Sequence, residues 1–381
     1  MSTNSFTLSR NARVYVSTVA TGFDDTNTKE IRVLDGFAFS QTPGTQEITV
    51  NEAGDTPTRG RSMFNQSLDP AEFSFDTYVR PYDDGLEIRA IEDTLWEAFA
   101  GPGNAAAGSP YTVRGATDLT VNFSESDVHQ LQQLYIFFDM DGVLFRLTQA
   151  VLNEVTLDFD IDGISTLSWS GQARGIARVS DLPSAEQFDP TADTPIQYEA
   201  FPTPEPTFMV TKFITMDLAS NIDLGSVDAA NANYKIALTG GNITMNNNIT
   251  YLTPEELGVI NQPIAHFTGS REIGGTFDCY LKTTGGADAA GTAGDPKPPA
   301  QLFADLAAAT NITTHDFDLK FTLRDQINNP TTCAFHLPHA HLVIPATDVQ
   351  DVLSLSVDFV GLNEDNNLEG SNEAVITYTV A

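Results

Sequence analysis

Basic residues are scarce in this sequence. Of 381 residues, 19 are lysine or arginine and 51 are aspartate or glutamate, so the formal net charge is −32. A surface that binds nucleic acid or an anionic membrane needs basic side chains to neutralise phosphates, and this composition argues against one. Adaptation to salt, or solubility alone, explains the charge equally well. The alternative is a surface that must avoid holding nucleic acid.

Cysteine and long apolar runs are also scarce. Cys279 and Cys333 are too few for a disulfide framework in a chain of this size, so we expect free thiols and assembly in a reducing compartment. No apolar run approaches 18 residues, and the first residues contain no apolar leader. We therefore expect no membrane span and no secretion by that route. No glycine-rich loop precedes a helix and no G-x-S-x-G motif occurs, so no nucleotide or other cofactor is expected.

Short alternating runs of Phe, Val, Ile and Thr dominate what is present, and they predict half-buried strands. The runs lie at 13–17, 31–34, 37–39, 48–50, 73–79, 119–123, 134–138, 143–147, 155–159 and 164–169. Apolar residues from Leu86 to Phe99 have helical spacing, and Gly101 follows them, so a helix is expected over 85–100. The proline-rich stretch 180–206 is typical of a linker. The fold class predicted is mainly β.

The pattern then repeats, with the elements in the same order. Phe75-Asp76-Thr77-Tyr78-Val79 matches Phe277-Asp278-Cys279-Tyr280-Leu281 at an offset of 202, and Leu34-Asp35-Gly36 matches Leu238-Thr239-Gly240 at 204. At an offset of 190, Phe145, Leu147, Ala150, Leu152, Trp169 and Gly171 fall on Phe335, Leu337, Ala340, Leu342, Phe359 and Gly361. The helix around Leu95 has a counterpart at 302–306. We interpret the chain as two tandem β-barrel or β-sandwich modules, 1–180 and 207–381, each with one flanking helix, joined by a linker at 181–206. Two unrelated β-domains with generic patterning are the alternative.

Two stretches of the first module resemble tail tube proteins of long-tailed bacteriophages. They are Ser9–Val16 with the Leu34-Asp35-Gly36-Phe37 strand behind it, and Arg59–Phe64 through Asp69–Pro81; in the second module, 249–281 occupies the same place. The resemblance implies a small β-barrel or sandwich whose modules assemble in rings of six around a lumen. It also implies a long loop that reaches the adjacent ring, which would be 41–72 and 244–272 here.

Two modules in one chain would make six-module symmetry with three chains. We therefore expect a trimeric, pseudo-hexameric ring that stacks head to tail into a filament. Head-to-tail contacts join two different surfaces, so they can repeat without limit along an axis. The resemblance further implies a virion location in the tail, assembly in the host cytoplasm, and contacts with tail sheath, tape measure, baseplate and tail terminator proteins. Genomic DNA would pass through without stable binding, and an acidic lumen wall would let it slide.

Charged residues in the two long loops are the candidates for ring stacking, because unpaired charges can form directional salt bridges when the next ring arrives. The candidates, with one aromatic residue, are Glu52, Arg59, Arg61, Phe64, Glu255, Glu256 and Arg271. Each of them is equally compatible with a solvated loop residue. A soluble β-sandwich binding or adhesion protein of the virion is the alternative function.

Three motifs suggest other chemistry. Asp139-Met140-Asp141-Gly142 matches the first motif of haloacid-dehalogenase-type phosphatases, but strand-like sequence follows it where a helix is needed, and a polar turn explains it. Asp158-Phe159-Asp160-Ile161-Asp162-Gly163 has the spacing of a calcium loop, yet Trp169 stands where the last carboxylate should be. His339 and His341 could form a zinc pair on one strand face, but no acidic or cysteine ligand is near in sequence. We expect no enzyme activity and no metal.

Overall fold

The computed structural model describes residues 12–21, 28–48, 62–101, 111–123, 131–140, 143–179, 208–221, 233–257, 260–282, 297–307, 316–326, 330–349, 353–363 and 373–380. This part of the chain is mainly β, with two short helices, as predicted from the alternating runs. None of its helices is long and apolar enough to cross a membrane. The predicted linker 181–206 lies outside the described residues.

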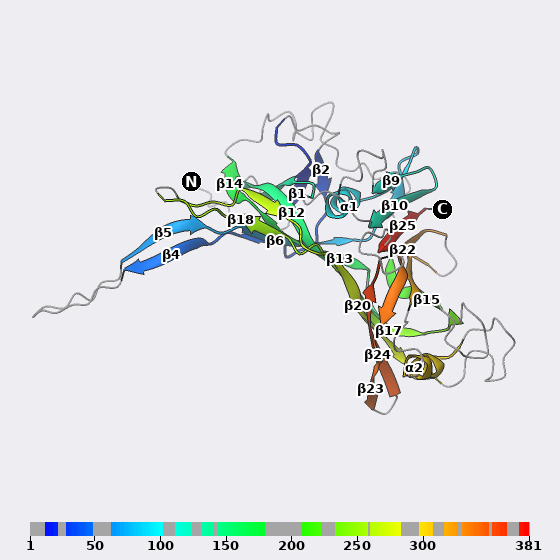
Figure 1. Cartoon of the computed structure of the whole chain (residues 1–381). Coiled ribbons are helices and arrows are strands. Elements are labelled where there is room, and N and C mark those ends of the chain that lie inside the picture. Colours follow the sequence, from blue (N-terminus) through cyan, green and yellow to red (C-terminus); the bar gives the residue numbers. More distant parts are fainter. Residues whose placement is uncertain are drawn as a thin grey trace, which may run out of the picture.

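The first half contains two groups of paired strands that share one long strand (Figure 1). The first group has the order β3-β6-β13-β12. The second has the order β2-β1-β11-β12-β14. Their bounds are β1 Ala12–Ser17, β2 Thr28–Ile31, β3 Ala38–Ser40, β6 Ala71–Tyr78, β11 Leu134–Met140, β12 Val143–Asp160, β13 Thr166–Ala173 and β14 Gly175–Val179. The groups face each other, since Phe39 of β3 stacks on Phe138 of β11 with ring centroids 4.8 Å apart.

The second half has the same two groups in the same order. Here they are β17-β20-β24-β23 and β16-β15-β21-β22-β25, and the end of β22 also pairs with β24. The bounds are β15 Val210–Ser220, β16 Asn233–Tyr234, β17 Leu238–Asn246, β20 Glu272–Tyr280, β21 Phe317–Arg324, β22 Thr332–Leu342, β23 Ala346–Val349, β24 Leu353–Gly361 and β25 Ala374–Thr379. β22 and β23 together occupy the place that β12 has in the first half.

A β-bulge occurs at the same position in both halves. In the first, Ile136 pairs with Leu147 and Leu134 with Ala150. In the second, Leu319 pairs with Leu337 and Phe317 with Ala340. Bulges locally bend a strand and re-aim its side chains, and each of these lies near the point where its strand passes from one group to the other. The 190-residue offset therefore matches the strand pairing here.

One cross-strand pair is reversed between the halves. Phe73 lies opposite Gly171, and a Cβ on that glycine would come within 2.6 Å of the phenyl ring. In the second half Gly275 lies opposite Phe359, with the corresponding distance 2.9 Å. The pairing thus aligns Phe359 with Gly171, not with Trp169, and the sequence match is wrong by two residues in this strand. Two residues are one strand period, so the predicted buried face is unchanged.

The first helix is shorter than the sequence predicts. α1 spans Asp93–Ala100, whereas Ile88–Ala90 form β8 and pair with β7 (Pro81–Asp83). The apolar spacing from Ile88 to Phe99 fits a helix, but it also fits a strand followed by a helix, because Ile88 and Ala90 alternate with Arg89. α2 spans Pro299–Ala307, at the position predicted for the second helix. Each helix buries an i, i+4 pair in the core, Leu95 with Phe99 and Leu302 with Leu306.

Three further hairpins complete the described fold. β4 (Pro43–Ile48) and β5 (Ser62–Leu68) form an arm that projects from the body, as Figure 1 shows. β9 (Thr112–Arg114) and β10 (Asp118–Phe123) follow α1, and β18 (Thr250–Leu252) pairs with β19 (Ala265–Phe267) in the second half. The sequence predicted only one short strand in the β4–β5 arm. β5 is exposed along most of its length and offers no burial alternation from which to predict it.

Candidate assembly interface

The two halves are joined through a β-ladder. The second part of β12 pairs with β13 on one edge and with β17 on the other, from Glu154 opposite Asn246 to Asp160 opposite Gly240. Side chains reinforce it: Asn246 Nδ2 donates to Glu154 Oε2 at 3.0 Å, and the hydroxyls of Thr156 and Thr244 lie 3.2 Å apart. The result is one continuous sheet, β3-β6-β13-β12-β17-β20-β24-β23, which crosses the boundary between the halves.

A second contact between the halves lies at α1. Trp96 is fully buried, and its ring centroid lies 6.2 Å from that of Phe335 on β22. Trp96 Nε1 donates to the Tyr378 hydroxyl at 2.7 Å, which donates in turn to Glu92 Oε1 at 2.8 Å. Burial raises the pKa of Tyr378 and of the nearby Cys333 thiol, so both stay protonated. β10 also pairs along β25.

Both cysteines are free and buried, in agreement with the prediction of free thiols. Burial also raises the pKa of Cys279, to about 11, which makes its thiol a poor nucleophile.

The ends of the continuous sheet have open edges. Among the described residues, β3 pairs only with β6, and β23 pairs only with β24. By strand order and offset, β3 is the counterpart of β17, and β23 is the counterpart of the part of β12 that joins β17. Each open edge is therefore equivalent to an edge that is paired inside the chain. Open edges are ready to pair with another strand.

One face of this sheet is acidic and exposed or half-exposed. Every second residue of its strands lies on this face, and matched registers continue the rows from strand to strand: Asp76, Ser168, Thr156 and Thr244 form one such row. The carboxylates on the face are Glu72, Asp76, Glu154, Asp158, Asp160, Glu272, Asp278 and Asp358. Its other side chains are mostly Ser, Thr and Asn, and its described residues include no Lys or Arg.

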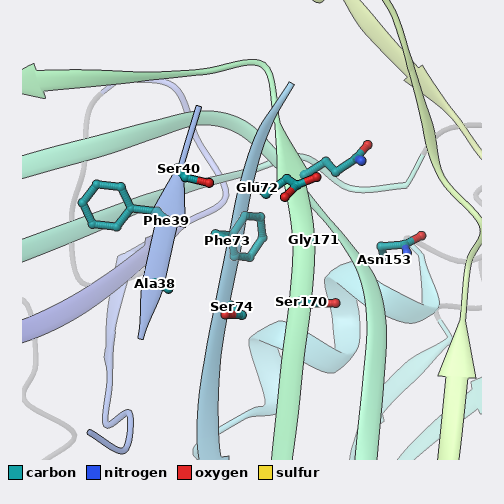
Figure 2. Close-up of a pocket in the computed structure, with 10 residues that line it drawn as sticks. Ala38, Phe39, Ser40, Glu72, Phe73, Ser74, Asn153, Ser170 and Gly171 are labelled. Carbon is teal, nitrogen blue, oxygen red and sulfur yellow. The ribbon is translucent and has the colours of Figure 1, made fainter. Parts of the chain in front are cut away.

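A cavity of about 420 Å³ lies at the β3 end of the sheet (Figure 2). Figure 2 shows Ala38, Phe39 and Ser40 of β3 beside Glu72–Ser74 of β6, with Asn153 on the far side. Among the described residues that line it, Glu72 is the only charged one. The cavity therefore presents one carboxylate among hydroxyl, amide and apolar side chains.

No family model matches the sequence. A curated relative does: tail tube protein pb6 of Escherichia phage T5 is 32% identical over 98% of this chain and 76% of that protein. The chain belongs to the family of bacteriophage tail tube proteins. It is a structural protein of the virion tail, and it associates with copies of itself to form the tube. The family favours this role over the adhesion and phosphatase alternatives.

The stacking candidates of this tail tube protein are dispersed. Glu52, Arg59 and Arg61 lie outside the described residues. Phe64 lies on the β5 side of the arm and is 49% exposed, and Glu255 and Glu256 are exposed after β18. Arg271 differs, because its guanidinium contacts Glu373 at 3.6 Å and Asn247 at 3.4 Å and lies over Phe123.

The second long loop of the tail tube protein contacts the first half of the same chain. The Tyr251 hydroxyl donates to the Gln149 carbonyl, and the Leu131 N–H donates to Nε2 of His266 at 3.0 Å. Burial lowers the pKa of His266, in keeping with an unprotonated Nε2. Between β18 and β19, Asn261 exchanges backbone hydrogen bonds with Gln66 and Leu68 at the base of the arm. The loop thus braces the arm.

A buried carboxylate organises the entry to α1 in this tail tube protein. Asp93 is 1% exposed and accepts from Arg89 Nε at 2.7 Å, from Arg114 Nε at 2.9 Å and from Lys29 Nζ at 3.5 Å. Burial acts to raise its pKa, but the charges of Lys29, Arg114 and Arg89 outweigh that and hold the pKa at about 2. Sequence reasoning missed this cluster, since its members come from four separate elements.

The three motifs that suggest a phosphatase, a calcium loop and a zinc pair lie on strands and turns. Asp139 lies one residue before the end of β11, and Leu144–Leu152 continue as β12, as expected for a hairpin; residues 141–142 lie outside the described part. Asp160 Oδ1 accepts the N–H of Ile161, within the bend that follows β12. His336 contacts Asp318 of β21 at 2.9 Å, and His339 contacts Asp316, the residue before β21, at 3.0 Å. The fold thus brings carboxylates that are distant in sequence to these histidines. Among the described residues, no group of three or more such ligands could hold a metal ion.

Proposed function

We propose that this tail tube protein consists of two tandem tube modules, 1–180 and 207–381, joined by the linker 181–206, and that three chains close a pseudo-hexameric ring. Two β-sandwich modules are supported by the repeated strand order, by the shared bulge and by the reversed Phe73–Gly171 pair. Each module carries one flanking helix. Six modules then require three chains.

The β12–β17 ladder is the observation that carries the proposal, because it serves as a template for the joint between chains. Applying the 190- and 204-residue offsets to Thr156 opposite Thr244 gives Ala346 of one chain opposite Ser40 of the next. The same operation gives Asp348 opposite Ala38. The two open edges would then pair, and a ring closed in this way has no unpaired edge in its inner sheet.

In such a ring the acidic face lines the lumen. Duplex DNA carries one negative charge per roughly 1.7 Å of its axis, so a wall with carboxylates and no described cation repels it along its whole length. Hydroxyl and amide side chains keep the wall wetted. DNA would pass during ejection without binding stably.

Stacking of rings would use the β4–β5 arm and the loop that follows β18. The exposed apolar side chains there are Ile48, Met63, Phe64, Leu252, Leu257, Ile260, Ile264 and Phe267. Exposed apolar groups of this extent mark contact sites, and Glu52, Arg59, Arg61, Glu255 and Glu256 would add charge pairs. Arg271, already engaged within the chain, would support the loop. Tail sheath, tape measure, baseplate and tail terminator proteins are the further partners, and no catalysis is involved.

Negative-stain imaging of the purified protein at rising concentration tests the proposal. We expect rings and then tubes with a central lumen. A protein that stays monomeric at every concentration, or forms a closed oligomer with no lumen, would refute it.

A further inference from the structure

The two helices are exposed to different degrees, although they are counterparts. Aligning Leu95 and Phe99 of α1 with Leu302 and Leu306 of α2 superimposes the buried i, i+4 pairs. This alignment matches Trp96 with Phe303.

Trp96 is fully buried, whereas Phe303 is only partly buried. The same holds one turn further along the helix, where Ala100 is buried and its counterpart Ala307 is exposed. One face of α2 therefore lacks a cover that α1 has. For α1, that cover includes Phe335 on β22 of the second half.

The counterpart of Phe335 is also less buried than Phe335 itself. At an offset of 190 it is Phe145 on β12, and the β-pairings agree, since Phe145 lies opposite Phe138 as Phe335 lies opposite Phe321. Phe335 is 1% exposed, but Phe145 is only partly buried, with Phe39 as its aromatic neighbour at 5.3 Å.

We propose that Phe303 of one chain packs against Phe145 of the next chain in the ring, which reproduces between chains the contact of Trp96 with Phe335. The partner is a second copy of this chain, because each of the two partly buried rings is the counterpart of one member of a buried pair. This inference rests on the proposed three-chain ring and adds the contact that closes the outer side of its joint.

The contact matters more between chains than within one. Inside the chain, β10 of the first half pairs with β25 of the second half. This pairing extends the group β16-β15-β21-β22-β25 across the joint between the two halves. The hairpin that supplies β10 lies within 101–133, between α1 and β11. Only residues 308–316 separate α2 from β21, fewer than the hairpin Thr112–Phe123 itself contains. Among the described residues, no strand follows α2 in the place that β10 takes after α1, so we expect the α2 aromatic contact to cover this side of the joint between chains.

Fluorescence of a Phe303→Trp variant tests the contact. Trp96 and Trp169 are 0% and 1% exposed, so the native tryptophans are shielded before assembly. Tryptophan also occupies the counterpart position, so the variant should fold and assemble. We expect the introduced indole to be quenched by acrylamide in unassembled protein, and to become blue-shifted and protected in tubes. Equal quenching before and after assembly would overturn the contact.

Cross-linking identifies the partner residue. In the variant with both Phe303→Cys and Phe145→Cys, a short bismaleimide should give covalent dimers and trimers from assembled tubes and no larger species. Cys279 and Cys333 are buried and should not compete. The two single-cysteine variants are the controls and should give no ladder.

The outcomes separate the two proposals. Wild-type tubes together with an unlinked double variant would overturn the Phe303–Phe145 contact and leave the tube function intact. A ladder in either single-cysteine variant would also overturn it. A wild-type protein that forms no rings would refute the proposed function, and this contact with it.

Discussion

Asp93 shows how one buried charge can hold separate elements together. Its carboxylate links β2 through Lys29, β8 through Arg89 and β9 through Arg114 to the first turn of α1. Removing one partner from a buried ion cluster typically costs about 3–5 kcal/mol, because the remaining charges stay desolvated. We expect a loss of this order in the free energy of unfolding of Asp93→Asn, measured in urea. Asp158→Asn, on the exposed face, is the control and should change the free energy of unfolding by no more than about 0.5 kcal/mol.

The same residue predicts a pH dependence. The folded pKa of Asp93, about 2, is below its ordinary value of about 3.9. Because the pKa is lower in the folded state, the ionised carboxylate stabilises the fold at pH values above the pKa of the unfolded state. This contribution, about 2–3 kcal/mol, is lost as pH falls from about 4 toward 2. The free energies of unfolding of wild type and Asp93→Asn should therefore converge in acid. A constant difference across this range would contradict the assignment.

The neighbouring strands come so close to Gly171 that its position has no room for a Cβ atom. A Cβ there would lie 2.2 Å from the Val151 carbonyl oxygen, as well as against the Phe73 ring. We expect Gly171→Ala to lower the free energy of unfolding by about 1–3 kcal/mol through overpacking. Gly163→Ala, whose Cβ would meet only Thr211 Oγ1 at 3.5 Å, is the matched control and should be close to neutral. Similar losses in both variants would argue against the steric explanation.

At the scale of elements, the sequence predicted strands with one buried face and missed those without one. β6 alternates buried and exposed residues along Ala71–Tyr78 and was predicted nearly to its ends. β5 and β14 lack that alternation and were not predicted. The start of α1 was wrong because local spacing cannot show that Ile88–Ala90 pairs with β7. The Asp93 cluster was beyond prediction for a related reason, since its partners meet only in the folded chain.

The β4–β5 arm carries an element-scale prediction. Phe64 is exposed and pairs only along the arm, so Phe64→Ser should leave thermal stability nearly unchanged while weakening the stacking of rings. Electron microscopy should then show shorter tubes or separate rings. Leu86→Ser removes an equally apolar but more exposed side chain in a turn of the body and should leave tube length unchanged. Equal tube lengths for Phe64→Ser and wild type would exclude this residue from stacking.

For the whole molecule, the sequence predicted a repeat, and the strand registers show where the predicted offset is correct and where it changes. The 190-residue offset holds through β12 and β22 but becomes 188 at β24, where Phe359 takes the place of Gly171. The β12–β17 ladder could not be predicted, because an edge pairs through backbone groups that every residue carries. The acidic composition was evident in the sequence, yet its distribution along one face requires the registers of the whole sheet.

The acidic face predicts how assembled tubes treat DNA. Wild-type tubes assembled with short duplex DNA at low salt should leave the DNA in the supernatant on sedimentation. Asp158→Lys combined with Asp278→Lys should make DNA co-sediment, and added salt should release it. The logarithm of the binding constant falls with the logarithm of the salt concentration by roughly 0.9 for each phosphate that is neutralised. The double Asn variant, which removes charge without adding cations, is the control. DNA retained by wild-type tubes as strongly as by the Lys variant would contradict an acidic lumen.

A symmetry-resolved electron cryomicroscopy map of the assembled tube would reveal whether three chains close each ring edge to edge. The map should show three chains per ring, with the backbone of β23 hydrogen-bonded to β3 of the next chain and Ala346 opposite Ser40. Six identical chains per ring, or rings joined through any other pair of edges, would contradict it.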